Sequence, residues 1–132
     1  MKRLLDTNAY VALLEGNAEV ASLVRSAERL VFSMVVAGEL LFGFRNGNRY
    51  EKNLTLLDEF LNEPWVELQP VTRTTADRFG RIAAALCKAG TPIPTNDIWI
   101  AAHAFETGAE LISFDRHFEN VRGLALTTVQ KS

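Results

Sequence analysis

Short apolar segments alternate with longer segments of helical period along this chain, and this alternation most limits how it can fold. Buried strands are predicted at 3–6, 30–33, 65–68 and 110–114, with a weaker candidate at 124–127. Amphipathic helices are predicted at 9–15, 18–28, 35–44, 49–62, 74–88 and 97–107. Strands that alternate with helices indicate an α/β fold, with a central, mainly parallel sheet of four to five strands and helices on both faces.

The size of the chain fits one domain. It has 132 residues and no internal repeat, low-complexity tract or linker, so we expect a single domain over 1–132. Its longest apolar runs are too short for a membrane span, and its amino terminus lacks the apolar stretch of a secretory signal. We therefore expect a cytoplasmic protein.

Four acidic residues fall where this fold would bring them together. Asp6 ends the first predicted strand, and Asp115 directly follows the fourth. Asp97 lies in the first turn of its helix, beside the expected caps Thr95 or Asn96, and Glu39 lies about one turn into the helix after the second strand. Because parallel α/β sheets bind ligands at the carboxyl ends of their strands, we expect all four acids at one edge of the sheet.

Each acid also has an ordinary structural explanation. Asp6 could cap the helix that follows it, Asp97 could favour a helix amino terminus, and Asp115 could be a turn residue. Glu39 fits such explanations least, because an unpaired carboxylate between apolar neighbours on a helix is costly. Since the four map to one edge, we interpret them together as one site.

Crowded carboxylates suggest a metal site. They repel one another unless a cation compensates, and a set of oxygen ligands suits Mg²⁺ or Mn²⁺ better than Zn²⁺. Such ions bind phosphodiester oxygens and activate water. No Ser-His-Asp set, phosphate-binding glycine loop or dinucleotide fingerprint competes with this reading. Polar residues near the acids in sequence could orient them by hydrogen bonding, or could serve ordinary turns and caps: Thr7, Asn8, Asn96 and Ser113.

The remaining metal-binding residue types are few. Cys87 is the only cysteine, which excludes an internal disulfide and a thiolate zinc cage, and we expect it to be buried as a small apolar residue. The two histidines, His103 and His117, lack a metal-binding spacing, and we expect His103 to be structural. The net charge of −2 excludes a uniformly basic surface for nucleic acid, but it becomes positive once a metal takes four carboxylates out of the balance.

Four motifs in order carry a family resemblance. They stand at residues 4–8, 38–40, 93–102 and 113–118, and each contains one of the four acids. With this ordered set the chain resembles PIN-domain ribonucleases, and in particular the VapC toxins of prokaryotic toxin–antitoxin pairs. No acidic position of the family is missing here.

The resemblance implies a three-layer α/β/α fold and Mg²⁺- or Mn²⁺-dependent RNA cleavage. It also implies a homodimer and neutralisation by a cognate VapB-type antitoxin whose tail lies in a groove near the site. The catalytic and metal-binding roles carry over to Asp6, Glu39, Asp97 and Asp115, with Asp6 and Asp97 as the expected direct ligands. Ser113 occupies the family's usual Ser/Thr position, and Asp115 would act through water or at a second metal.

Two surfaces are weaker candidates. An apolar stretch could line the antitoxin groove or simply pack in the core: Leu40, Leu41, Phe42 and Phe44. Basic side chains could contact RNA phosphates or be solvated surface charges: Arg45, Arg49, Lys52 and Arg116.

Two other functions remain open. A phosphotransfer enzyme of the haloacid dehalogenase type would also place an aspartate after the first strand, but it needs a second aspartate two positions on, where this chain has Asn8. A non-catalytic binding module could keep the fold, and loss of an acid would favour it.

Overall fold

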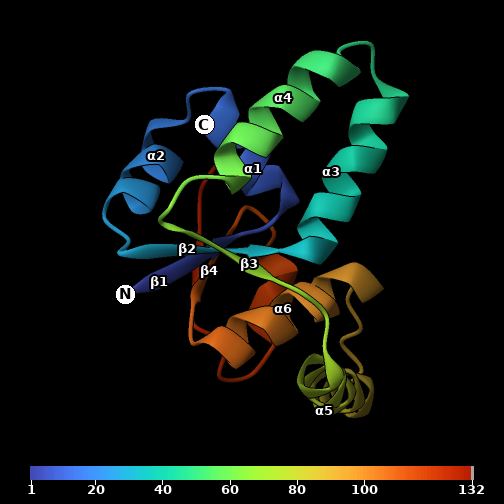
Figure 1. Cartoon of the computed structure of the whole chain (residues 1–132). Helices are drawn as coiled ribbons and strands as arrows, with labels where there is room; N and C mark the ends of the chain where they lie inside the picture. The colour runs from blue at the N-terminus through green and yellow to red at the C-terminus, as the bar shows by residue number, and fades with distance from the viewer. Residues whose placement is uncertain (132) are drawn as a thin grey trace.

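The computed structural model describes residues 1–131, which form a five-stranded sheet between two layers of helices (Figure 1). The strands lie in the order β3-β2-β1-β4-β5, and every neighbouring pair is parallel. Their bounds are β1 (Lys2–Leu5), β2 (Arg29–Ser33), β3 (Val66–Gln69), β4 (Glu110–Ser113) and β5 (Leu126–Thr128). The predicted α/β fold is confirmed, with a fully parallel sheet.

Helices cover both faces of the sheet. Figure 1 shows α1, α2 and α4 on one side and α5 and α6 on the other, while α3 and α4 form a hairpin that projects from the body. The helices are α1 (Thr7–Leu14), α2 (Ala18–Arg25), α3 (Met34–Asn46), α4 (Tyr50–Leu61), α5 (Arg73–Ala89) and α6 (Thr95–Thr107), followed by the short 3-10 helix η1 (Arg116–Asn120). Every predicted element exists, with ends displaced by at most three residues.

The central strands are apolar on both faces because helices cover both. Leu4 and Leu5 on β1 and Leu111 and Ile112 on β4 are all buried, so the strands show continuous apolar runs instead of alternation. On the α1 and α4 side, aromatic rings meet edge to face in a chain that runs from Tyr10 through Phe60 to Trp65. This two-sided core fixes the sheet edges from which the loops emerge.

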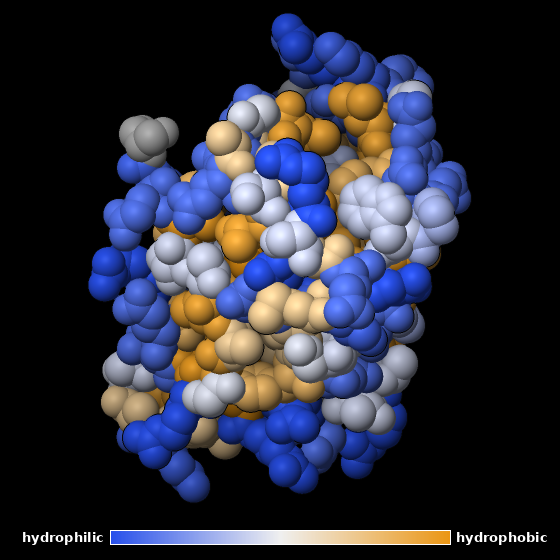
Figure 2. Space-filling model, turned by 90° about the vertical axis from the view of Figure 1, so that its left-hand side faces the viewer, coloured by the Kyte–Doolittle hydropathy of each residue, from blue (hydrophilic) through white to orange (hydrophobic). Residues whose placement is uncertain are grey.

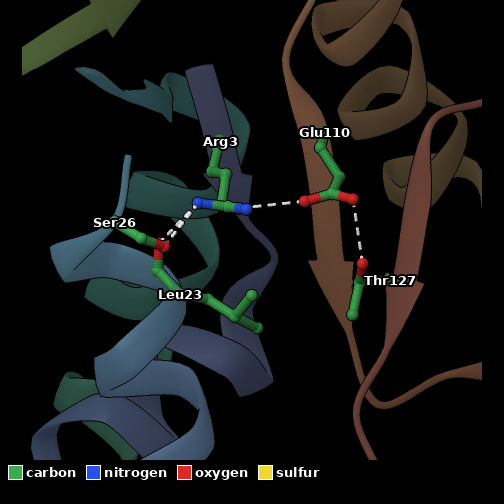
Figure 3. A network of polar contacts seen from close by, with 5 residues as sticks. All are labelled: Arg3, Leu23, Ser26, Glu110 and Thr127. Atoms are coloured by element: carbon green, nitrogen blue, oxygen red, sulfur yellow. Dashed lines mark hydrogen bonds and ion pairs between the residues drawn. The ribbon is translucent and has the colours of Figure 1, made fainter. Parts of the chain in front are cut away.

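A polar network holds the amino ends of the central strands (Figure 3). Arg3 on β1 donates to Glu110 on β4 at 2.9 Å, and also to the Leu23 carbonyl and the Ser26 hydroxyl of the α2 region. Thr127 on β5 donates to the other oxygen of Glu110 at 2.9 Å. The network therefore links three strands and a helix at the sheet end opposite to the acids.

His103 is structural, as predicted, and it joins three segments. Its side chain is fully buried, with Nδ1 2.8 Å from the Ser33 hydroxyl and Nε2 3.1 Å from the Pro70 carbonyl. The Pro70 oxygen can only accept, so Nε2 carries the proton and Nδ1 accepts from Ser33. The Ser33 oxygen in turn accepts from the Val35 amide at the start of α3, so α6 is tied to the β2–α3 junction.

Two local predictions were wrong. Cys87 is exposed, because α5 buries the neighbouring Leu86 on its α6-facing side and turns the next residue outward. Neither Thr95 nor Asn96 caps α6: the helix begins at Thr95 after an N-cap at Pro94. The Pro94 carbonyl accepts from the first-turn amides, which leaves the Asn96 side chain available for the neighbouring acid.

The surface mixes polar and apolar residues. Figure 2 shows one side of the molecule, on which hydrophilic side chains border smaller hydrophobic areas. Among residues 1–131, no helix has both the length and the apolar content required to cross a bilayer.

Candidate active site

All four predicted acids line one cleft of about 500 Å³ at the carboxyl edge of the sheet. They arrive from segments far apart in the sequence, because the ends of β1 and β4 and the starts of α3 and α6 meet at this edge. The other residues of the lining are Thr7, Asn8, Pro94, Thr95 and Asn96.

Asp6 is the most enclosed of the acids, with 3% of its surface exposed. One oxygen accepts from the Ala9 amide at 2.9 Å, which caps α1, and the other accepts from the Ser113 hydroxyl. Burial raises the pKa of the Asp6 carboxyl to about 6 in spite of these hydrogen bonds, and the negative charges of Asp115 and Asp97 add to the rise. Asp6 therefore caps α1 and, when ionised, also carries a negative charge that its buried surroundings disfavour.

Glu39 is held by polar residues from two other elements. Thr7 donates its hydroxyl to one carboxylate oxygen, and Asn96 donates its amide to the other at 3.3 Å. The acid is half-buried and aims into the cleft, which explains how a carboxylate fits between apolar neighbours on α3. Both contacts were anticipated as a general orienting role for these polar residues.

Asp97 has a partner that the sequence reasoning missed. His117 lies with Nε2 2.8 Å from Asp97 Oδ2. Burial raises the pKa of the Asp97 carboxyl; His117 acts in the opposite direction, and the charges of Glu39 and Asp115 add to the rise. The signal was available, since His117 stands two residues after Asp115 in a turn that leaves the same sheet edge.

Asp115 also lines the cleft and is positioned through its backbone amide. Its amide donates to the Ser113 hydroxyl at 2.9 Å, and the same hydroxyl donates to Asp6. Ser113 is fully buried and therefore couples the ends of β1 and β4. Asn8 lines the cleft and is exposed.

The cleft is an acidic chamber, and its donor set fits a hard cation. The charges of Asp115 raise the pKa of both Asp6 and Asp97, which indicates carboxylates near enough to repel. Among residues 1–131, no three Asp, Glu, His or Cys side chains already surround a point where an ion would sit. The carboxylate oxygens that line the cleft suit Mg²⁺, which commonly takes one or two carboxylates and completes its shell with water.

The predicted RNA-contacting side chains lie outside this cleft. Arg45 donates to the Tyr50 hydroxyl at 2.9 Å and its guanidinium lies 4.6 Å from the centre of that ring. Arg116 pairs with Glu119 at 3.5 Å. Arg49 and Lys52 are exposed around the start of α4.

The apolar stretch on α3 divides between core and surface. Leu40 and Phe44 are buried in the core, as the plain packing alternative required, and Leu41 is half-buried. Phe42 is 68% exposed, so it alone presents most of its ring to solvent.

Comparison with known proteins gives consistent matches over nearly the whole chain. Residues 3–124 match the PIN domain family. Ribonuclease VapC2 of Haemophilus influenzae (strain ATCC 51907 / DSM 11121 / KW20 / Rd) is 34% identical over 128 residues, which cover 94% of this chain and 95% of that relative. The tRNA(fMet)-specific endonuclease VapC of Salmonella typhimurium (strain LT2) is 26% identical, covering 96% of each chain. The solved structure of VapBC-1 from nontypeable Haemophilus influenzae matches with a TM-score of 0.85 and 28% identity, over 97% of this chain and 98% of that one.

Proposed function

Because this chain belongs to the PIN-domain family and, within it, to the VapC ribonucleases, we propose that it is an endoribonuclease dependent on Mg²⁺ or Mn²⁺ and the toxin of a toxin–antitoxin pair. The observation that carries this proposal is the convergence of four carboxylates on one cleft, where burial and mutual repulsion raise the pKa of Asp6 and Asp97. A bound cation would compensate this crowded negative charge and keep the carboxylates ionised at neutral pH.

Asp6 and Asp97 are the proposed direct metal ligands, with Glu39 beside them and Asp115 acting through water or at a second metal. When bound, Mg²⁺ or Mn²⁺ would neutralise a phosphodiester oxygen and lower the pKa of a water molecule. The surrounding residues keep the ligand oxygens in place: Ser113 holds Asp6, and Thr7 and Asn96 hold Glu39.

Contacts to the RNA backbone must come from outside the cleft. No lysine or arginine appears in its lining within residues 1–131, so the acids alone would repel phosphates. The proposed phosphate contacts are exposed side chains around α3, α4 and η1: Arg45, Arg49, Lys52 and Arg116. Cleavage should therefore weaken as the salt concentration rises.

We extend two further features of the relatives to this chain as proposals. Solved neighbours are VapBC complexes, which supports a VapB-type antitoxin as the partner that keeps the enzyme inactive, and we propose a homodimer within that complex. Two relatives are named tRNA(fMet)-specific endonucleases, which makes tRNA(fMet) the first RNA to test.

The other functions considered have less support. Asn8 stands where a haloacid dehalogenase-type enzyme needs its second aspartate, and an amide cannot exchange a proton with a leaving group. All four acids are present and gathered, which does not favour a module that has lost catalysis.

The test is cleavage of tRNA(fMet) and of mixed cellular RNA by purified, antitoxin-free protein. We expect internal cuts with Mg²⁺ or Mn²⁺, none with a chelator, and at least about a hundredfold slower cleavage by Asp6→Asn, since losing a catalytic group costs that much or more. Equal cleavage by both proteins, or a covalent phosphate on Asp6, would reject the proposal.

A further inference from the structure

A second hollow of about 590 Å³ lies directly beside the acidic cleft, on the outer face of α3. It is lined by Val35, Gly38, Glu39, Phe42 and Asn96. Glu39 and Asn96 line both hollows, so the two adjoin at these side chains. A molecule held in the cleft can therefore extend along this wall.

Phe42 dominates this wall. It is the most exposed large hydrophobic residue among those described, at 68%. Positions 35, 38, 39 and 42 follow the spacing of one helix face, which places the ring one turn beyond Glu39. A Cβ added at Gly38 would meet no atom within 4 Å, so the space beside the ring is open.

The same face of α3 continues to a cation. Arg45 follows Phe42 by three residues, and Glu39 and Arg45 are separated by about 9 Å of helix rise. The hydrogen bond and ring contact with Tyr50 hold its guanidinium in place. An acid, an exposed ring and a positioned cation thus follow one another along the outside of this helix.

The chemistry of the proposed substrate identifies the occupant. RNA is a chain, so the nucleotides that flank the scissile phosphate must lie against the walls of the cleft. Neither hollow has a lysine or arginine in its lining within the described part of the chain, so inside the hollows no cationic side chain attracts the phosphates, and Arg45 lies beyond them. Aromatic rings bind unpaired bases by stacking, whatever the base.

We propose that an unpaired RNA base next to the scissile phosphodiester stacks on Phe42, and that Arg45 contacts the following phosphate. This inference rests on the proposed ribonuclease function. It predicts a preference for single-stranded or loop RNA, because a base that is paired and stacked inside a duplex cannot stack on the Phe42 ring. A partner protein on the same wall is the competing occupant, and the experiment separates the two.

The experiment measures RNA binding by fluorescence anisotropy in the Asp6→Asn background, with Mg²⁺ and labelled oligo(A) and oligo(U) decamers as probes. Phe42→Ala should weaken oligo(A) binding by between about fivefold and a hundredfold, and Phe42→Trp should restore it. Phe42→Leu should not restore it, because it is apolar without a π-face. Leu14→Ala, an exposed apolar residue at the far end of α1, is the matched control and should change nothing.

Salt dependence separates the ring from the cation. Phe42→Ala should lower affinity without changing the slope of log K against log salt, whereas Arg45→Gln should reduce that slope by about one. Equal binding by Phe42→Ala and its parent, or full rescue by Phe42→Leu, would overturn the proposal. So would unchanged RNA binding with lost inhibition by the antitoxin, which would assign the wall to the partner.

The proposed function can fail separately. If the unmutated chain cleaves RNA and Phe42→Ala cleaves the same RNA with the same KM, only the proposed stacking on Phe42 is wrong. If the unmutated chain cleaves no RNA with either metal, the ribonuclease proposal is wrong, and so is the proposed stacking of an RNA base on Phe42.

Discussion

At the scale of single residues, Asp6 has a structural role, but its surroundings disfavour the ionised form of its carboxyl group. It caps α1 and accepts from Ser113, yet burial raises the pKa of its carboxyl to about 6 from an ordinary 3.8. Folding therefore favours the protonated form. Its contribution to stability is fully present below about pH 4 and is lost as the pH rises to 6, which leaves a cost of about 3 kcal/mol at pH 7.

Replacing this charge should stabilise the metal-free protein. We expect Asp6→Asn to raise the free energy of unfolding by about 1–3 kcal/mol at pH 7, because the amide keeps the cap without the buried charge. The gain should disappear at pH 4, where the native carboxyl is protonated. Urea unfolding with a chelator at both pH values checks this, and a variant less stable at both would contradict it.

His117 offers a second test at this scale. Its hydrogen bond fixes one oxygen of Asp97, and loss of such an orienting partner typically costs 10- to 100-fold in metal affinity. We expect His117→Ala to weaken Mn²⁺ binding, measured by calorimetry, by about that factor, and His117→Gln, whose amide can still donate, to weaken it less. Unchanged affinity in His117→Ala would show that the contact does not orient the ligand.

Single residues also show where sequence reasoning reaches its limit. The acids could be placed because each follows a strand or opens a helix, and topology takes such positions to one edge. Cys87 was misjudged because helical period identifies a buried face only when the face of the packing partner is known. His117 was missed because its partner Asp97 stands 20 residues earlier, on α6 before β4, so the contact depends on how α6 and η1 pack and not on local periodicity.

At the scale of elements, the site depends on how α3 and α6 are joined, since they carry Glu39 and Asp97. The hydrogen bonds of His103 with Ser33 and Pro70 make this connection in the buried core. Burial lowers the pKa of His103, so its contribution to stability is present above its unfolded value near 6.5 and is lost as the pH falls. The sequence identified the residue as structural but not the segments that it connects.

Removing the hydrogen bonds of His103 should lower the stability of the protein. We expect His103→Ala to lower the free energy of unfolding by about 2–4 kcal/mol at pH 7, because it leaves a cavity and buried polar groups without partners. Cys87→Ala on exposed α5 is the control and should change stability by less than about 0.5 kcal/mol. If urea unfolding shows that His103→Ala lowers the free energy of unfolding by less than about 1 kcal/mol, the proposed connecting role of His103 is contradicted.

At the scale of the whole molecule, the order β3-β2-β1-β4-β5 explains why distant segments form one site. Strands β1 and β4 are adjacent and parallel, so Asp6 and Asp115, which follow them closely, leave the sheet side by side. The alternation of strands and helices predicted this much. It did not predict strand order, the exposed wall of α3 or the partners of each acid, because these depend on packing between elements.

The central claim is that the four acids act as one metal-dependent site for RNA cleavage. The most direct measurement is the single-turnover rate of RNA cleavage with Mn²⁺ for the parent chain and four amide variants, Asp6→Asn, Glu39→Gln, Asp97→Asn and Asp115→Asn, with Glu106→Gln on α6 as the control. We expect each of the four to slow cleavage, by at least about a hundredfold for Asp6 and Asp97, and the control to cleave at the parent rate. Parent-like rates in Asp6→Asn and Asp97→Asn would contradict the claim.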